Sequence, residues 1–259
     1  MKTRIITAVV ALAIFIPILW LGGIYIEIAS AVLAFVGVSE IFIMKKMMVI
    51  HPIAILAMLM GVALTLPDTF FKGLWLNKNG LFYAFILILL VATVFYNQTF
   101  NIEDAGVIAI CTFYVGHGFF YLTAARDKGL PYLFYALLLV WTTDIFAYLV
   151  GRKFGKHPLD PVVSPHKTWE GSVGGTIAAV IVVLIYNAFV PLQKNLGILI
   201  IATIALSIIG QIGDLAESSL KRHYNVKDSG KILPGHGGIL DRFDSFLFVF
   251  PCLHLLGFF

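Results

Sequence analysis

Nine apolar stretches, each near the length of a membrane-crossing helix, constrain this 259-residue chain more than any other feature. A helix needs about 20 mainly apolar residues to cross a bilayer. The chain is 60% apolar and only 12% charged, which leaves too few polar residues to cover a soluble core. A soluble enzyme, a disordered chain and a disulfide-stapled secreted domain are therefore excluded. We predict an all-α polytopic membrane protein with about nine transmembrane helices, at approximately 5–22, 24–43, 49–66, 80–96, 104–122, 131–150, 172–192, 196–213 and 245–259.

The placement of lysine and arginine predicts the orientation of these spans. With the N-terminus in the cytoplasm, 13 of the 18 basic residues lie in inner loops and five lie in outer loops. This is the asymmetry that the positive-inside rule describes, so we expect a cytoplasmic N-terminus. The formal net charge of +4 is small and is typical of cytoplasmic loops, so we expect no nucleic-acid partner.

The chain shows no internal repeat or linker, and a single membrane domain over residues 1–259 is the simplest interpretation. Residues 1–130 carry little chemistry and are predicted to be mainly scaffold spans. Glu27 and Glu40 lie near the ends of the second span, where we expect both to reach the interface. Residues 131–259 are predicted to form the catalytic part.

Charged residues are concentrated in two short segments of that second part. Residues 144–171 and 210–245 together hold 17 of the 32 charged side chains. In the first segment Asp144 lies inside the sixth span, where a carboxylate needs a partner or a water-filled cavity. Either Asp144 pairs with Arg152, two helical turns further on, or it borders a polar cavity open to the cytoplasm.

The residues that follow this span include candidate phosphate ligands. Ser164 and Pro165 fit an N-cap and the first helical position, so a helix is predicted to begin near Lys167. A helix N-terminus with a lysine and hydroxyls nearby suits an anion such as phosphate; the alternative is a positively charged loop with no further role. Gly171 and Gly175 predict close helix packing, either within the chain or between subunits.

The second charged segment gives the strongest signal. Asp214, Ser218 and Lys221 recur at helical spacing and share one face, and Asp241 and Asp244 are one helical turn apart. Carboxylates without thiolates suit a hard ion such as Mg²⁺, and lysine and arginine suit phosphate oxygens. These residues predict a phosphate–metal site. Between the two helices lies a turn whose glycines allow close backbone approach to a ligand, Leu233-Pro234-Gly235-His236-Gly237-Gly238.

A longer pattern contains these residues and resembles the signature of the phosphatidate cytidylyltransferase (CDP-diacylglycerol synthase) family. Segments 144–156 and 164–175 are also similar to that family, so the resemblance covers roughly 140–250. It implies transfer of a cytidylyl group from CTP to phosphatidic acid, giving CDP-diacylglycerol and pyrophosphate in phospholipid biosynthesis. The pattern itself reads Ser219-Leu220-Lys221-Arg222, then Lys227-Asp228, then Leu233-Pro234-Gly235-His236-Gly237-Gly238-Ile239-Leu240-Asp241-Arg242-Phe243-Asp244.

The resemblance also implies roles for single residues. Asp214 and Asp241 are the leading metal ligands, supported by Asp244, for Mg²⁺ beside a second cation such as K⁺. These three carboxylates and Lys221 are the expected catalytic residues. Expected substrate contacts come from basic side chains, from hydroxyls and from the turn, which supplies donors or shapes the nucleotide pocket: Asp144, Arg152, Ser164, Lys167, Thr168, Ser218, Arg222, Lys227, Gly235, His236, Gly237, Gly238 and Arg242.

The setting expected from the resemblance is a multi-pass protein of the bacterial inner membrane. CTP, phosphatidic acid and membrane lipid are the expected partners, and a homodimer is expected. The active site would lie in a polar cavity that faces the cytoplasm, where the lipid head group meets a water-borne nucleotide. Two alternatives stay open: a secondary transporter, whose site would lie near the midplane between related repeats, and another CTP-dependent lipid-phosphate enzyme.

Overall fold

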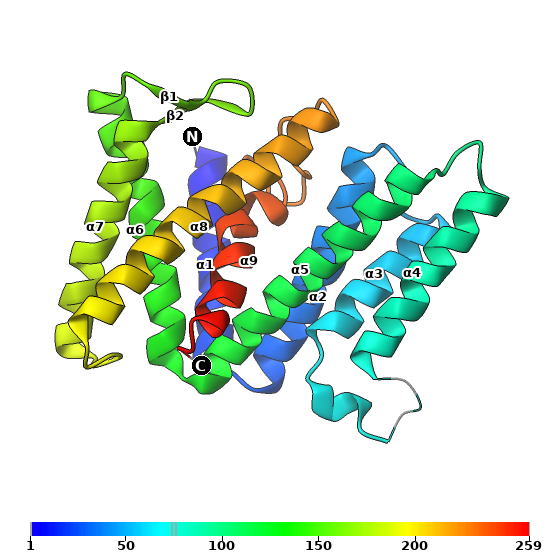
Figure 1. The fold of residues 1–259 in the computed structure, drawn as a ribbon, viewed down its shortest axis with the longest axis horizontal. Helices are drawn as coiled ribbons and strands as arrows, with labels where there is room; N and C mark the ends of the chain where they lie inside the picture. The colour runs from blue at the N-terminus through cyan, green and yellow to red at the C-terminus, as the bar shows by residue number, and fades with distance from the viewer. Residues whose placement is uncertain (1, 74, 76, 259) are drawn as a thin grey trace. The chain divides into compact units, whose positions relative to one another are not determined.

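The computed structural model describes residues 2–73, 75 and 77–258. Nine α-helices are present in this part of the chain, together with one short 3₁₀ helix, η1 (Asp68–Phe71), and a two-stranded hairpin of β1 (Pro158–Asp160) and β2 (Ser164–Thr168) (Figure 1). The prediction of an all-α protein is confirmed. The helices are α1 (Lys2–Leu21), α2 (Ile24–Met44), α3 (Pro52–Thr65), α4 (Lys78–Phe95), α5 (Ile102–Lys128), α6 (Leu130–Phe154), α7 (Trp169–Phe189), α8 (Leu196–His223) and α9 (Leu240–Leu255).

Six of these helices, α2, α4, α5, α6, α7 and α8, are long and apolar enough to cross a membrane. Shorter apolar helices cover Ile6–Leu21 and Pro52–Thr65, and α9 has 16 residues. Each helix overlaps one predicted span, because long apolar runs in lipid can satisfy their backbone groups only within a helix. The protein is therefore an integral membrane protein, and the number of crossings stays a prediction.

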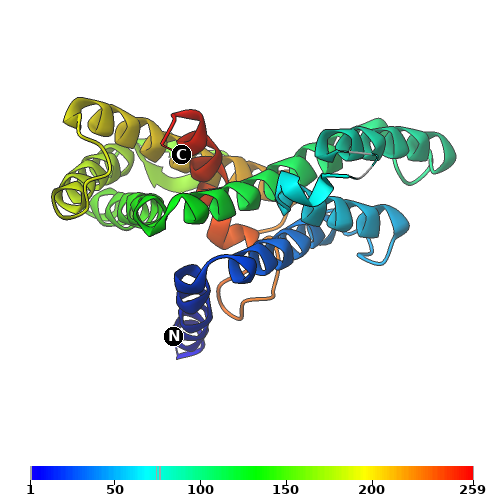
Figure 2. The same ribbon diagram turned by 90° about the horizontal axis from the view of Figure 1, so that it is seen from below.

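The chain divides into two compact units that are described separately. The first unit contains residues 1–123 and 228–241. Within it α2 and α3 lie close together, because Gly61 has no side chain and faces Val38, and Gly116 of α5 faces Leu64 in the same way. A buried hydrogen bond of 2.8 Å joins the hydroxyls of Ser30 and Thr123. Figure 2 shows the loop that precedes α9 running beside α2.

One expectation about this unit was wrong. Glu40 does not reach the membrane interface, because its side chain is fully buried (0% exposed). Its carboxylate accepts hydrogen bonds from the backbone N–H groups of Ile239 and Leu240. A buried carboxylate is retained only where such donors compensate for its lost hydration. Glu27, in the first turn of the same helix, is partly exposed.

The second unit contains residues 124–227 and 242–259, and its tightest contact joins α6 and α7. A Cβ atom built on Gly175 would lie 2.5 Å from the backbone oxygen of Thr143, and one on Gly171 would lie 2.6 Å from that of Ala147. The close packing predicted from these two glycines is therefore made within the chain. Figure 1 shows α7 lying alongside α6.

The predicted helix begins at Trp169, two residues after Lys167, but the assignment of Ser164 and Pro165 to its N-cap and first helical position was wrong. Residues Ser164–Thr168 form strand β2, which pairs antiparallel with β1, and α7 begins at Trp169 with Thr168 as its N-cap. The Thr168 hydroxyl accepts a hydrogen bond of 3.1 Å from the N–H of Gly171. A proline disfavours the helical conformation of the residue before it, so Pro165 keeps Ser164 extended. Pairing with β1 keeps the next residues extended, and the helix begins only after Thr168, whose hydroxyl provides the cap.

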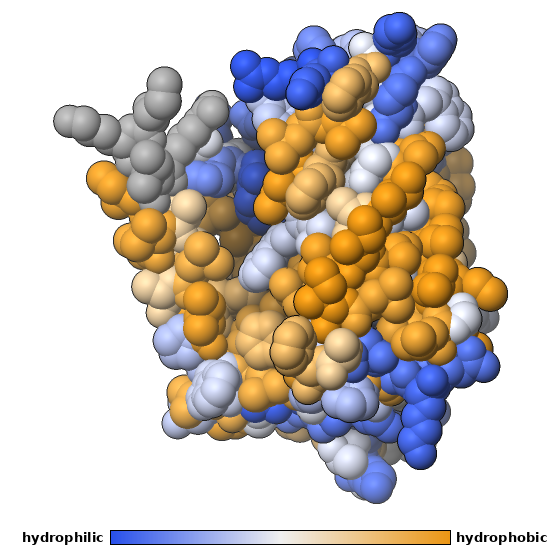
Figure 3. Space-filling model, turned by 90° about the vertical axis from the view of Figure 1, so that its left-hand side faces the viewer, coloured by the Kyte–Doolittle hydropathy of each residue, from blue (hydrophilic) through white to orange (hydrophobic). Residues whose placement is uncertain are grey.

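The outer face of α7 is apolar. Val173, Ile177, Ile181 and Ile185 recur every four residues, and each is more than half exposed. Figure 3 shows apolar side chains gathered over this side of the molecule, with hydrophilic side chains near its two ends. Such a stripe is unfavourable in water and favourable against lipid tails, which supports a membrane location.

Candidate active site

Helices α8 and α9 bring two of the predicted carboxylates into one region of the second unit. Gly213 lets the helices approach, since a Cβ atom there would lie 2.8 Å from the backbone oxygen of Asp244. Asp214 follows Gly213 on α8, and its charge interacts with those of Asp244 and Asp144. We call Asp144, Asp214, Glu217 and Asp244 the carboxylate cluster.

Asp214 is held by two predicted site residues. The Nζ atom of Lys167, on β2, lies 2.5 Å from Asp214 Oδ2, and the Ser218 hydroxyl donates to Asp214 Oδ1 at 3.4 Å. The sequence prediction that Asp214 and Ser218 share a helix face is confirmed. The hairpin is fixed by Glu170, whose carboxylate accepts from the N–H groups of Lys156 and His157. Lys167 thus reaches the carboxylate cluster from a strand whose hairpin is held in place by these hydrogen bonds.

Glu217 is a site residue that sequence reasoning missed. Its side chain is 2% exposed and forms an ion pair of 2.6 Å with Lys221, one turn further along α8. Lys221 was predicted to be catalytic and to share a helix face with Asp214, and in the structure it pairs with Glu217. The i, i+4 spacing of Glu217 and Lys221 was visible in the sequence. What the spacing alone could not reveal is that this face of α8 is buried.

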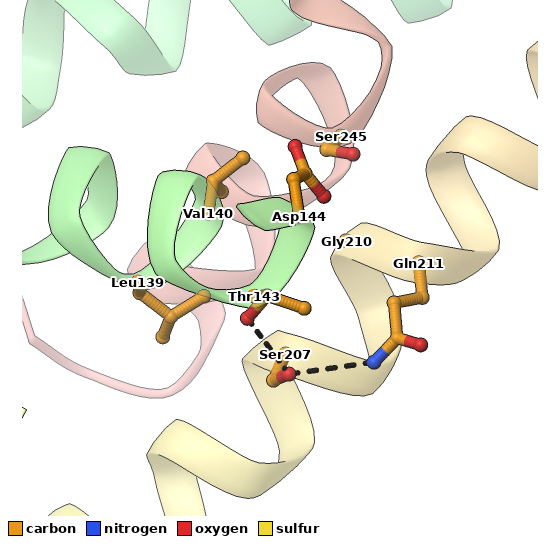
Figure 4. Close-up of a pocket in the computed structure, with 8 residues that line it drawn as sticks. All are labelled: Leu139, Val140, Thr143, Asp144, Ser207, Gly210, Gln211 and Ser245. Atoms are coloured by element: carbon orange, nitrogen blue, oxygen red, sulfur yellow. Dashed lines mark hydrogen bonds between the residues drawn. The ribbon is translucent and has the colours of Figure 1, made fainter. Parts of the chain in front are cut away.

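Asp144 lines a narrow pocket between α6, α8 and α9. Figure 4 shows its carboxylate pointing toward Ser245 of α9, beside a hydrogen-bonded group formed by Thr143, Ser207 and Gln211. The charges that act on Asp144 are those of Asp214, Lys167 and Arg242.

Of the two alternatives for Asp144, the pair with Arg152 is not formed among the residues that the structure describes, and the polar cavity stays a prediction. The guanidinium of Arg152 donates a hydrogen bond of 3.5 Å to the hydroxyl of Tyr148.

Two other predicted basic residues of this unit, Arg222 and Lys227, lie at or just beyond the end of α8. Arg222 donates to the backbone oxygens of Val163, in the hairpin, and Val226, at 3.4 and 3.5 Å. It therefore ties the hairpin to the end of α8. Lys227 is exposed, and Ser164 is partly exposed at the start of β2.

Asp241 belongs to the first unit together with the glycine-rich turn. Its Oδ2 atom accepts three hydrogen bonds, from the N–H and the hydroxyl of Ser229 and from the N–H of Gly238, at 2.8, 2.9 and 2.8 Å. Gly235 and Gly237 adopt positive φ angles of 77° and 84°, a conformation that glycine adopts without strain.

Some backbone N–H groups of this turn already donate hydrogen bonds to other atoms of the protein. The N–H of Gly238 binds Asp241, and the N–H of His236 binds the backbone oxygen of Leu233 at 2.8 Å. Of the two roles expected for the turn, supplying donors or shaping a pocket, these bonds favour shaping. The pairing of Asp241 with Asp214 at one metal stays a prediction.

Within residues 2–73, 75 and 77–258, no three His, Cys, Asp or Glu side chains form a ready-made set of metal ligands. The chemistry of the carboxylate cluster nevertheless suits a hard cation. Its potential donors are all oxygen atoms, and Asp214 already binds the ammonium group of Lys167. An oxygen-only donor set fits Mg²⁺ rather than a soft metal.

The fold and this cluster define a class: a helical membrane protein with a polar, carboxylate- and lysine-containing site. Comparison with known proteins then gives the family. The sequence matches the Cytidylyltransferase family over residues 2–259, and the chain belongs to that family.

Named relatives agree with this assignment. The chain is 46% identical to the phosphatidate cytidylyltransferase of Staphylococcus haemolyticus over 258 residues, which are 99% of this chain and 98% of the relative. It is 44% identical over 259 residues to the protein of that name from Staphylococcus epidermidis, and 43% identical over 258 residues to that from Staphylococcus aureus, with the same coverage. The resemblance first seen in residues 140–250 therefore extends along the whole chain.

Proposed function

We propose that this protein is a phosphatidate cytidylyltransferase, which makes CDP-diacylglycerol and pyrophosphate from CTP and phosphatidic acid. The observation that carries the proposal is the ion pair between Lys167 and Asp214 beside the carboxylate cluster, in a chain that belongs to the cytidylyltransferase family. This membership favours nucleotidyl transfer over a secondary transporter and over another CTP-dependent lipid-phosphate enzyme.

In the proposed reaction an oxygen of the lipid phosphate attacks the α-phosphorus of CTP. The bond from that phosphorus to the bridging oxygen of the β-phosphate breaks, and pyrophosphate leaves with the bonding electron pair. The lipid phosphate is already ionised, so the protein must position it and stabilise the leaving group more than it must remove a proton.

Two groups of residues would bind the two substrates. Lys167 and Arg152, with Ser164 and Thr168 nearby, would contact the phosphatidate head group. Lys221, Ser218, Arg222, Lys227 and Arg242 would contact the CTP phosphates, with Gly235, His236, Gly237 and Gly238 shaping the nucleotide pocket and Asp144 lining the cavity. Ammonium and guanidinium groups suit these roles because they form charge-assisted hydrogen bonds with phosphate oxygens.

Mg²⁺ is the proposed cofactor. Asp214, Asp241 and Asp244 are the ligands that the resemblance implies for it, with a second cation such as K⁺ also possible. When bound, the metal would neutralise charge on the phosphates of CTP and on departing pyrophosphate. The ammonium group of Lys167 lies beside Asp214, and we propose that it binds the lipid phosphate in the working enzyme.

We further propose the setting in which this reaction occurs. The N-terminus and the site would face the cytoplasm of a bacterial cell, because this orientation puts 13 of the 18 basic residues in inner loops and the reverse orientation only five. The chain would act as one membrane domain in the inner membrane, about nine crossings in all, and assemble as a homodimer.

The decisive experiment supplies the purified protein with labelled CTP, phosphatidic acid and Mg²⁺ in detergent or liposomes. Formation of labelled CDP-diacylglycerol with an equal amount of pyrophosphate is the expected result. Diacylglycerol as acceptor in place of phosphatidic acid is the matched control and should give no labelled lipid. A folded protein that makes neither product would overturn the proposal.

A further inference from the structure

Glu40 reaches from the second helix to the loop that precedes α9. Within the first unit its Oε1 atom accepts the N–H of Ile239 at 2.7 Å, and its Oε2 atom accepts the N–H of Leu240 at 2.9 Å and the hydroxyl of Ser229 at 3.1 Å. Nearly 200 residues of chain separate the acceptor from these donors. The carboxylate is fully buried, so this set of contacts replaces its hydration.

These hydrogen bonds cap the N-terminus of α9 with a side chain from another helix, α2. The first N–H groups of a helix have no partner within the helix, and the N-terminus carries a partial positive charge. A nearby side chain of the loop or of the helix commonly supplies the cap. Here a carboxylate of another helix satisfies the N–H of Leu240 and its neighbour, which fixes where α9 begins relative to α2.

The same loop is built around the Glu40 carboxylate. A Cβ atom on Gly230 would lie 2.6 Å from Glu40 Oε1, and one on Gly238 would also collide with Glu40. The Ser229 hydroxyl contacts both Glu40 Oε2 and Asp241 Oδ2. Two glycines and one serine of the loop are thus explained by the space and the acceptor that Glu40 provides.

We propose that Glu40 is a positioning residue for cytidylyl transfer, which fixes loop 228–240 and through Ser229 sets the orientation of the Asp241 carboxylate. This inference rests on the proposed function. Glu40 acts through the loop and does not itself contact substrate. Loss of the Glu40 carboxylate should therefore weaken CTP binding, which depends on Asp241 and the glycine-rich turn. Binding of phosphatidic acid by Lys167 should not change.

The first test measures the loop without using activity. Amide hydrogen exchange is followed by mass spectrometry in the full-length protein, in Glu40→Gln and in the matched control Glu27→Gln from the same helix. Glutamine keeps the size but loses the charge and one acceptor, so peptides containing residues 239–240 should exchange about tenfold faster or more, as expected for lost charge-assisted bonds. Peptides from 246–250 should not change, and Glu27→Gln should match the wild type.

The second test separates positioning from loss of folded protein. In Glu40→Gln the KM for CTP should rise about tenfold, while the KM for phosphatidic acid stays within about twofold of the wild type. Activity that falls only in proportion to the amount of folded protein, with both KM values and the kcat per folded molecule unchanged, would overturn the inference. Unchanged exchange at 239–240 would overturn it as well.

If Glu40→Gln does not fold, a second variant, Ser229→Ala, tests the same proposal. Ser229→Ala removes the shared hydroxyl and leaves both backbone bonds of Glu40 in place, so it should raise the KM for CTP with a normal thermal unfolding temperature. Wild-type kinetics in Ser229→Ala would then refute the proposal. If the wild-type protein transfers no cytidylyl group, the proposed function fails, whereas the exchange data still decide whether Glu40 holds the loop.

Discussion

Lys167 on β2 and Asp214 on α8 form an ion pair of 2.5 Å, and both side chains are about 30% exposed. A candidate lipid-phosphate ligand is therefore held by a candidate metal ligand. The pair gives each group a defined position before substrate arrives, and a lipid phosphate or a metal ion can compete for either partner. Because both groups are partly solvated, the pair stabilises the fold little and its importance lies in the site.

Replacement of Lys167 with methionine tests its role in binding phosphatidic acid. Methionine keeps much of the length and removes the charge, so kcat/KM for phosphatidic acid should fall about a hundredfold, the effect of losing a charge-assisted hydrogen bond. Lys156→Met, at an exposed position before the hairpin, should behave like the wild type. Steady-state kinetics with varied phosphatidic acid measure the effect, and an unchanged KM for the lipid would remove Lys167 from that role.

Removal of the metal tests the carboxylate cluster. EDTA should abolish turnover and added Mg²⁺ should restore it, because pyrophosphate is a poor leaving group without charge neutralisation. Asp214→Asn should raise the Mg²⁺ concentration for half-maximal activity about tenfold, since one anionic ligand is lost. Glu103→Gln, at an exposed position on α5, is the control. Full activity after chelation would contradict the proposed Mg²⁺ dependence.

Asp241→Asn should abolish turnover without unfolding the protein. The asparagine oxygen can still accept hydrogen bonds from Ser229 and Gly238, so the loop keeps most of its contacts, whereas the negative charge expected at the metal is gone. Thermal unfolding in detergent and the CTP assay measure the two effects. If Asp241→Asn keeps full activity, Asp241 is not a metal ligand.

Gly175→Ala should destabilise the second unit by about 1–3 kcal/mol, the usual range for overpacking. Its new methyl group would meet the backbone oxygen of Thr143, and backbone cannot move aside as a side chain can. Gly106→Ala on α5 is the matched control, because open space surrounds that position and alanine favours helix. Thermal unfolding of both variants should show a lower temperature for Gly175→Ala alone.

Orientation can be read from two engineered cysteines placed beyond opposite ends of α7. With Cys111 and Cys252 replaced by serine, Lys194→Cys should react with a membrane-impermeant maleimide in intact spheroplasts. Lys156→Cys should react only after permeabilisation. The 21-residue helix between these positions is about 30 Å long, the thickness of the hydrocarbon layer. The reverse labelling pattern would contradict a cytoplasmic site.

The helices could be predicted from sequence because lipid leaves the backbone no alternative. Each predicted span overlaps a helix, and the boundaries differ most where polar ends continue the helix, as in α8, which extends ten residues beyond the predicted span to His223. The hairpin was missed because β1 and β2 are short and polar and have no apolar alternation. The two strands form only because they pair with each other, and neither segment shows in its own sequence that it will pair.

For the candidate site too, some features could be predicted from the sequence and others depended on the tertiary structure. By itself the sequence determined that this is a helical membrane protein, that carboxylates and basic residues gather in two segments, and that the signature resembles a cytidylyltransferase. Local spacing also placed Ser218 next to Asp214. Only the tertiary structure decided that Lys167 pairs with Asp214, that Glu217 holds Lys221, and that Glu40 is buried beneath the loop before α9. Those contacts join residues whose burial and distance depend on how helices pack, and helical periodicity carries no information about the partner across the interface.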